Sequence, residues 1–124
     1  MTSTNHPLLL ATAALNVLLS LGHTTKGLEQ FKHPTLNALP RALRGAVTAG
    51  WYEGSVFFLI TGILNYKYSQ TGLVDLADKT VAGLLTSLCV GAGVHYYRTG
   101  DKPTATILWV VALLQGLGAK KAAL

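Results

Sequence analysis

One carboxylate and two imidazoles of this chain stand where they could exchange protons in an apolar environment. Glu53 lies within a stretch free of Lys and Arg, residues 45–65, and His23 and His95 each lie at the end of another apolar stretch. An ionised side chain in hydrocarbon costs roughly 2.5–3.5 kcal/mol on insertion scales, so such a residue usually faces a protein interior and marks a site. A buried, neutral carboxyl group beside a histidine could then act as a general acid.

The elements that would position these residues are four apolar stretches, none interrupted by Lys or Arg. A helix that spans a membrane needs about 20 residues, so the second stretch is the most secure, and the first and fourth are short. We therefore predict an all-α fold, an integral membrane four-helix bundle that forms a single domain over residues 1–124. The predicted spans are residues 7–21, 45–65, 80–97 and 104–119.

Composition favours a multi-pass membrane protein. The chain is 50% hydrophobic and only 12% charged, with a mean hydropathy of +0.40, whereas a soluble domain carries about 25% charged residues. A signal peptide is disfavoured because residues 1–7 contain no Lys or Arg. A soluble bundle is disfavoured because residues 80–94 lack a charged stripe. The endoplasmic reticulum is one candidate host membrane.

The net charge and the histidine and cysteine content indicate which classes of partner to expect. The net charge is +5, but the basic residues are spread over loops and ends, so attraction to anionic lipid explains them better than nucleic acid does. The four histidines lack metal-binding spacing and Cys89 is the only cysteine, so we expect no metal site and no cofactor. The expected partners are membrane lipids and a lipophilic small-molecule substrate, and a homo-oligomer is left open.

Four spans would bring the polar residues of the chain to one membrane face. At a rise of 1.5 Å per residue, Glu53 would lie about 12 Å below Gly45, and Asn16 about 10 Å below His23. The helical face of Glu53 is rich in small residues on its N-terminal side, which favours an inward orientation. We therefore predict a polar funnel built from Asn16, His23, Glu53 and His95.

Within this funnel, the acid and base groups are the candidate catalytic residues, and an amide and aromatic rings are the candidate substrate contacts. The catalytic set is Glu53, His23 and His95, and the substrate-binding set is Asn16, Trp51, Tyr52 and Trp109. Structural roles stay open, because the carboxyl group could be a neutral hydrogen-bonding group and the histidines could meet lipid headgroups. The segment 22–44, with apolar anchors at Leu28, Phe31, Leu36 and Leu39, is either a surface connector or a lid.

The run GHTTKGLEQFKHP, followed by LPRALRGAVTAGWYEGSVFFLITGILNY, resembles small four-span integral membrane proteins of fungi, and its layout is distantly similar to DoxX-like proteins. The resemblance covers roughly residues 20–70 and places no family active-site residue on this chain. Some similarly small fungal membrane proteins belong to secondary-metabolite pathways, where they open epoxides or close rings on lipophilic polyketides and terpenoids. The resemblance thus implies a type of chemistry by analogy.

Two function hypotheses follow. The first is a membrane-embedded tailoring enzyme, a cofactor-independent hydrolase or cyclase that applies acid and base chemistry to a lipophilic small molecule in secondary metabolism. The second is a non-catalytic multi-pass membrane protein that acts as an assembly factor or binds a lipid, with Glu53 in a hydrogen-bond network between helices. A transporter is less favoured because no inverted repeat is visible.

Overall fold

The computed structural model describes residues 5–123, and all regular structure in this part of the chain is helical. The helices are α1 (Pro7–Gln30), α2 (Pro34–Asn37), α3 (Arg41–Thr71), α4 (Leu76–Arg98) and α5 (Lys102–Ala122). The prediction of an all-α fold is therefore confirmed. Each of the four predicted spans is shorter than the helix that contains it, because the polar residues that flank the apolar stretches continue the helices.

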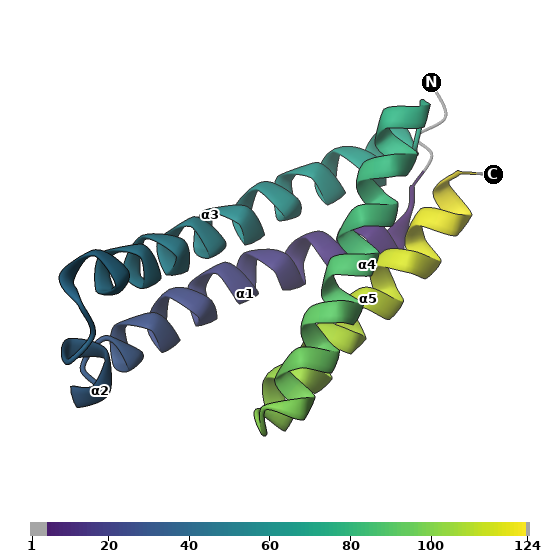
Figure 1. Cartoon of the computed structure of the whole chain (residues 1–124). Helices are drawn as coiled ribbons and strands as arrows, with labels where there is room; N and C mark the ends of the chain where they lie inside the picture. Colours follow the sequence, from purple (N-terminus) through teal and green to yellow (C-terminus); the bar gives the residue numbers. More distant parts are fainter. Residues whose placement is uncertain (1–4, 124) are drawn as a thin grey trace.

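The long helices form two antiparallel hairpins (Figure 1). α1 packs along α3 and α4 packs along α5, while α1 also contacts α5 where the hairpins meet. α1 begins and α5 ends near this meeting end, and the hairpins diverge toward α2 on one side and the α4–α5 turn on the other. The predicted four-helix membrane bundle is thus not confirmed.

Three of the helices are long and apolar enough to cross a membrane, namely α1, α3 and α5, with 24, 31 and 21 residues. α4 is not among them although it has 23 residues. Its apolar stretch is bounded by Asp78 and Lys79 at one end and by polar residues 95–98 at the other, which lowers its mean hydropathy. A fourth span therefore stays a prediction.

Local sequence explains where several helices begin and end. The side chain of Asp75 accepts a hydrogen bond from the Asp78 N–H at 2.8 Å and caps α4. Asp101 accepts one from the Thr104 N–H at 3.2 Å and caps α5. These bonds satisfy amide groups that a helix start leaves without a partner. α3 ends at Gly72, whose φ of +70° is a conformation that glycine adopts without a steric penalty.

α1 continues through residues 22–30, which the sequence pattern assigns to a connector. Neither Gly22 nor Gly27 interrupts it. Gly27 is buried because the indole of Trp51 lies over it, and an added Cβ would be 2.3 Å from that ring. The predicted connector is therefore too long, and the chain between α1 and α3 is residues 31–40, which include α2.

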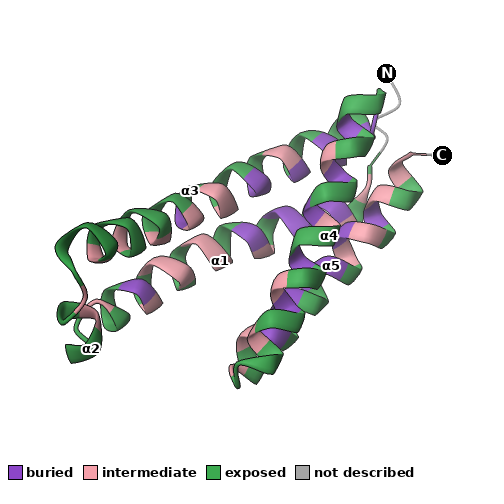
Figure 2. Cartoon of the chain, viewed as in Figure 1, coloured by how far each residue is buried: buried purple, intermediate pink, exposed green. Residues whose placement is uncertain are grey.

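The interior is thin and mixes small apolar with polar side chains, and most of the helix surface is exposed (Figure 2). Leu18 and Leu113, for example, are 62% and 61% exposed. An apolar exterior around small and polar helix contacts is suited to a lipid environment. Polar residues no more than 1% exposed are Thr12, Asn16, Asn65, Ser69 and Gln115.

Two of these buried amides join the hairpins near their meeting end. Asn65 Nδ2 donates to Gln115 Oε1, and Gln115 Nε2 donates to Asn65 Oδ1, each at 2.8 Å. Asn65 Nδ2 also donates to the Thr61 carbonyl at 3.0 Å. The two side chains are 0% and 1% exposed. This reciprocal pair satisfies polar groups that would be costly to bury alone.

Candidate functional site

Glu53 lies on the outer surface of α3, so the prediction that it faces the interior is wrong. It is exposed and forms no hydrogen bond or ion pair within residues 5–123. The side chains of Trp51, Ser55 and Phe58 reach α1 from this part of α3. A helix has 3.6 residues per turn, so Glu53 points about 200° round the helix from Trp51.

His23 is half-buried between α1 and α3. Its ring stacks on Trp51, with ring centroids 4.7 Å apart, and meets the edge of Phe58 at 5.5 Å. Its Nδ1 lies 3.0 Å from Ser55 Oγ, to which Thr24 Oγ1 donates at 2.9 Å. Ser55 Oγ itself donates to the Trp51 carbonyl at 3.3 Å. The His23 ring and the hydroxyl groups of Ser55 and Thr24 thus form one polar cluster between α1 and α3.

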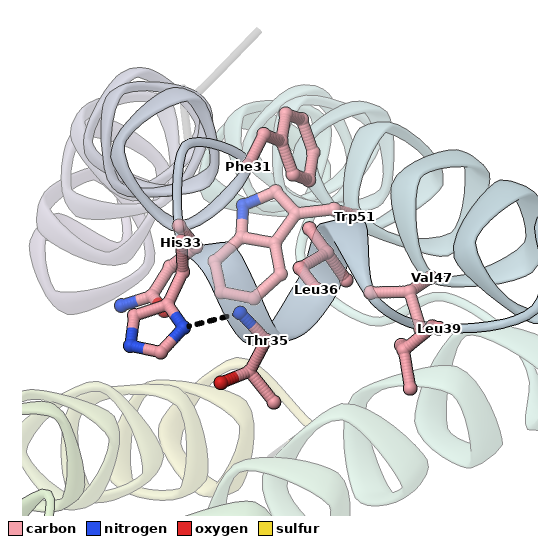
Figure 3. Close-up of a pocket in the computed structure, with 8 residues that line it drawn as sticks. Phe31, His33, Thr35, Leu36, Leu39, Val47 and Trp51 are labelled. Carbon is pink, nitrogen blue, oxygen red and sulfur yellow. Dashed lines mark hydrogen bonds between the residues drawn. The ribbon is translucent and has the colours of Figure 1, made fainter.

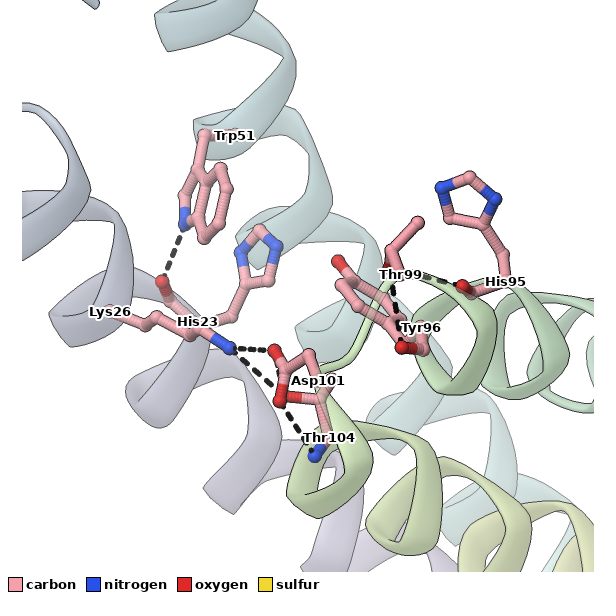
Figure 4. A network of polar contacts seen from close by, with 8 residues as sticks. All are labelled: His23, Lys26, Trp51, His95, Tyr96, Thr99, Asp101 and Thr104. Carbon is pink, nitrogen blue, oxygen red and sulfur yellow. Dashed lines mark hydrogen bonds and ion pairs between the residues drawn. The ribbon is translucent and has the colours of Figure 1, made fainter. Parts of the chain in front are cut away.

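His95 lies apart from His23 (Figure 4). It is exposed near the end of α4, and its ring meets Tyr96 edge-on at a centroid distance of 6.2 Å. Because Glu53 and His95 lie on the outside of different hairpins, the three candidate catalytic residues do not converge. The predicted polar funnel, which also included Asn16, is therefore wrong.

Two further residues of the α1–α3 hairpin, Asn16 and Tyr52, were predicted to contact substrate, but they do not lie together. Asn16 is buried in α1, where its Nδ2 donates to the Thr12 carbonyl at 2.9 Å. Tyr52 is 47% exposed, and its ring meets Phe31 at a centroid distance of 5.6 Å. Asn16 and Tyr52 thus lie in separate environments, one inside the helix packing and one on its surface.

Trp51 and Trp109, both predicted to contact substrate, each pack across one hairpin. Trp51 Nε1 donates to a backbone carbonyl of α1 at 2.6 Å, and Trp109 Nε1 donates to one of α4 at 3.4 Å. Each ring covers a glycine of the opposite helix, Gly27 or Gly93, where an added Cβ would lie 2.3 or 2.4 Å from the indole. The tryptophans therefore set the close approach of the two helices in each hairpin.

A pocket of about 320 Å³ opens beside Trp51, between the end of α1, α2 and the start of α3 (Figure 3). Its rim includes His33, whose Nδ1 accepts a hydrogen bond from the Thr35 N–H at 3.2 Å. Three of the four apolar anchors expected in the connector thus line a pocket, and Leu28 does not. Val47 on α3 is an apolar wall residue that the sequence pattern did not single out. The lining residues are Gln30, Phe31, His33, Thr35, Leu36, Leu39, Val47 and Trp51.

Three basic residues lie close in the sequence to residues that line this apolar pocket. Lys32 stands between two lining residues, and Arg41 and Arg44 lie in the first turns of α3, before the lining residue Val47. Arg44 Nη1 donates to the Asn37 carbonyl at 3.4 Å, which holds this cation near α2. An apolar pocket with a basic rim suits an amphiphile with an anionic head.

An ion pair joins the hairpins at their diverging ends (Figure 4). Lys26 Nζ contacts Asp101 Oδ2 and also donates to Thr104 Oγ1 at 2.9 Å. Thr104 Oγ1 donates to Asp101 Oδ2 at 2.8 Å. Hydrogen bonds from Lys26 and then from Thr104 lower the pKa of Asp101 to about 2. The carboxylate form of Asp101 is therefore strongly favoured in the folded protein.

This ion pair predicts a pH dependence of stability. The pKa of Asp101 is about 2 in the folded protein and about 3.9 for an aspartate in an unfolded chain. The stabilisation is therefore complete above the unfolded value and is lost as the pH falls through the folded value. We expect wild type to melt above Asp101→Asn at neutral pH, and the difference to vanish near the folded pKa, in thermal melts in detergent micelles. Lys26→Met should reduce the same dependence, because the hydrogen bonds from Thr104 remain. A difference that stays constant with pH would contradict the ion pair.

Comparison with protein-family models, curated protein sequences and solved structures finds no match to this chain. The resemblance to small fungal membrane proteins therefore stays a prediction. Within residues 5–123, no three His, Cys, Asp or Glu side chains gather as a metal site would require. The pocket beside Trp51 is the described feature that combines concave shape, apolar lining and nearby charge.

Proposed function

We propose that this protein is a non-catalytic multi-pass membrane protein that binds an anionic membrane lipid at the α1–α2–α3 end. The observation that carries this proposal is the pocket of about 320 Å³ beside Trp51, lined mainly by apolar and aromatic side chains. Ligand pockets typically have volumes of about 300–1,000 Å³. A volume at the lower end of this range suits one segment of an acyl chain better than a whole lipid.

The surroundings of the pocket are consistent with delivery of a lipid from a bilayer. Both helices that bound it, α1 and α3, are long and apolar enough to cross a membrane. Leu28 and Leu43, on these two helices, are each 50% exposed. Apolar surface thus extends along the helices to the end that holds the pocket, and an acyl chain could reach it without crossing water.

The basic residues beside the pocket account for the anionic headgroup in the proposal. Arg41 and Arg44 offer planar guanidinium groups that match a phosphate with two parallel hydrogen bonds, and Lys32 adds a point charge. Basic clusters next to membrane helices attract anionic lipids by about 1 kcal/mol per residue. A neutral or zwitterionic lipid would gain less from these groups.

The tailoring-enzyme hypothesis has weaker support from the geometry. Acid and base catalysis requires both groups within hydrogen-bond reach of one substrate. Glu53 and His95 lie on the outer surfaces of different hairpins, and His23 is packed against Trp51 between α1 and α3. Lipid binding needs only the pocket and its basic rim, so we favour it over catalysis.

A larger side chain that fills the pocket should weaken lipid binding. Val47→Phe adds a ring at the pocket wall, and we expect retention of phosphatidylglycerol to weaken about tenfold, equivalent to about 1.4 kcal/mol. Native mass spectrometry of the full chain released from detergent micelles measures this retention. Val56→Phe is the matched control, because Val56 lies on the same helix, is 55% exposed and does not line the pocket.

The basic rim is tested separately from the pocket. Replacing Lys32, Arg41 and Arg44 together by Gln should remove the preference for phosphatidylglycerol over phosphatidylcholine while leaving some binding of both. Equal retention of phosphatidylglycerol by Val47→Phe and Val56→Phe would contradict the pocket as the binding site. An unchanged lipid preference in the triple variant would contradict recognition of an anionic headgroup.

A further inference from the structure

Two oppositely charged side chains on the outer faces of different hairpins have no partner within residues 5–123. These are Glu53 on α3 and Arg98, the last residue of α4; both are exposed. The ion pairs of the described chain use other residues. Because α3 is apolar enough to cross a membrane, an unpaired carboxylate on its outer face is costly unless a cation from outside the monomer reaches it.

Both charges lie at the same end of the molecule. The ring of His23 packs against α3 beside Glu53. One turn further along α1, Lys26 contacts Asp101, which follows Arg98 by three residues. The chain of contacts from α3 through α1 to the α4–α5 turn therefore places Glu53 and Arg98 at similar levels, in the half of the molecule toward α2 and the α4–α5 turn.

The helix faces near both charges are open. A Cβ added to Gly50, one turn before Glu53, would have no neighbouring atom within 4 Å, and the same is true of Gly91 on α4. Both glycines are exposed. Small residues allow helices in a membrane to approach closely. A further helix can therefore lie against either face without a steric clash at these positions.

We propose that two copies of the chain associate in the membrane, with α3 of each copy against α4 of the other. Glu53 of each copy then pairs with the partner's Arg98, so a two-fold interface contains the pair twice. A second copy is the occupant that the charges favour, because copies in one bilayer share an orientation and place the missing cation at the matching level. This association goes beyond lipid binding and does not depend on it.

Charge reversal tests this interface. In a homodimer of Glu53→Arg, the new cation at position 53 would face the partner's Arg98. In a homodimer of Arg98→Glu, Glu53 would face the new carboxylate at position 98 of the other copy. Such contacts cost several kcal/mol, so each variant alone should dimerise about a hundredfold more weakly than wild type. Native mass spectrometry of the full chain across a concentration series measures the dimer fraction.

A mixture of the two single variants gives the decisive measurement. In the mixed dimer, both contacts again join opposite charges, so heterodimers of Glu53→Arg with Arg98→Glu should form at wild-type concentrations. Their formation also shows that each variant is folded. Lys120→Glu is the control, because it reverses an exposed charge near the end of α5, far along the chain from Arg98. Mixing Lys120→Glu with Glu53→Arg should not restore the contact at position 53.

Three results would overturn the proposal. The first is a wild-type chain that stays monomeric throughout the concentration series. The second is single variants that dimerise as strongly as wild type. The third is a mixture of Glu53→Arg and Arg98→Glu that fails to form heterodimers. Each result would assign the exposed charges to something other than a second copy.

Discussion

Asn65→Leu and Gln115→Met are each expected to lower the free energy of unfolding by about 1–3 kcal/mol, because each leaves the opposite amide buried without its partner. The two amides exchange hydrogen bonds of 2.8 Å and are 0% and 1% exposed. The double variant should recover most of the loss, since no unpaired polar group remains in the contact. Unfolding measured in detergent micelles for all four proteins gives the coupling energy.

Asn16→Leu is the matched control for this cycle. Asn16 is equally buried, at 1% exposure, but its amide donates to the Thr12 carbonyl within its own helix. Its substitution leaves no partner amide unpaired across the hairpins, so we expect no coupling with Gln115→Met. If the losses from Asn65→Leu and Gln115→Met simply add, the pair does not join the hairpins as described.

Gly27→Ala is expected to lower the free energy of unfolding by about 1–3 kcal/mol through overpacking. The added Cβ would lie 2.3 Å from two atoms of the Trp51 ring. Trp51 would have to move away from its stacked position on His23 and lose its 2.6 Å hydrogen bond to the His23 carbonyl. Thermal melts measure the loss, and a shift of Trp51 emission in a Trp109→Phe background reports the movement of the ring.

Gly22→Ala is the control with the opposite expected sign. Gly22 lies on the same helix, and a Cβ added there would have no neighbour within 4 Å. Alanine favours a helix over glycine by up to about 1 kcal/mol, so this variant should be as stable as wild type or more stable. Destabilisation by both substitutions would mean that the contact between Gly27 and Trp51 does not set the packing of α1 and α3.

The positions of the helices are predictable from the apolar stretches, but their ends are not. The predicted stretch 45–65 lies inside α3, and 104–119 lies inside α5. α1 passes its predicted end because Thr25 donates its hydroxyl hydrogen to the Leu21 carbonyl, four residues back, at 2.9 Å. A polar side chain that bonds its own helix in this way does not end the helix.

The orientation of Glu53 could not be predicted from its helical face. Small residues lie on several sides of the N-terminal half of α3, and they favour helix contact without specifying which face is used. α1 packs against the face that carries Trp51 and Ser55 because the indole fits over Gly27. That contact turns Glu53 outward.

The local amino-acid pattern specifies the all-helical fold, the four apolar stretches that each lie within one helix, and which residues share a helical face. Only the tertiary structure decides that Glu53 and His95 lie outside, that His23 packs against Trp51, and that the connector forms a pocket with Val47. Periodicity is local, because it follows from the helical turn. The choice of contacting faces depends on steric and hydrogen-bond matches between residues far apart in the chain.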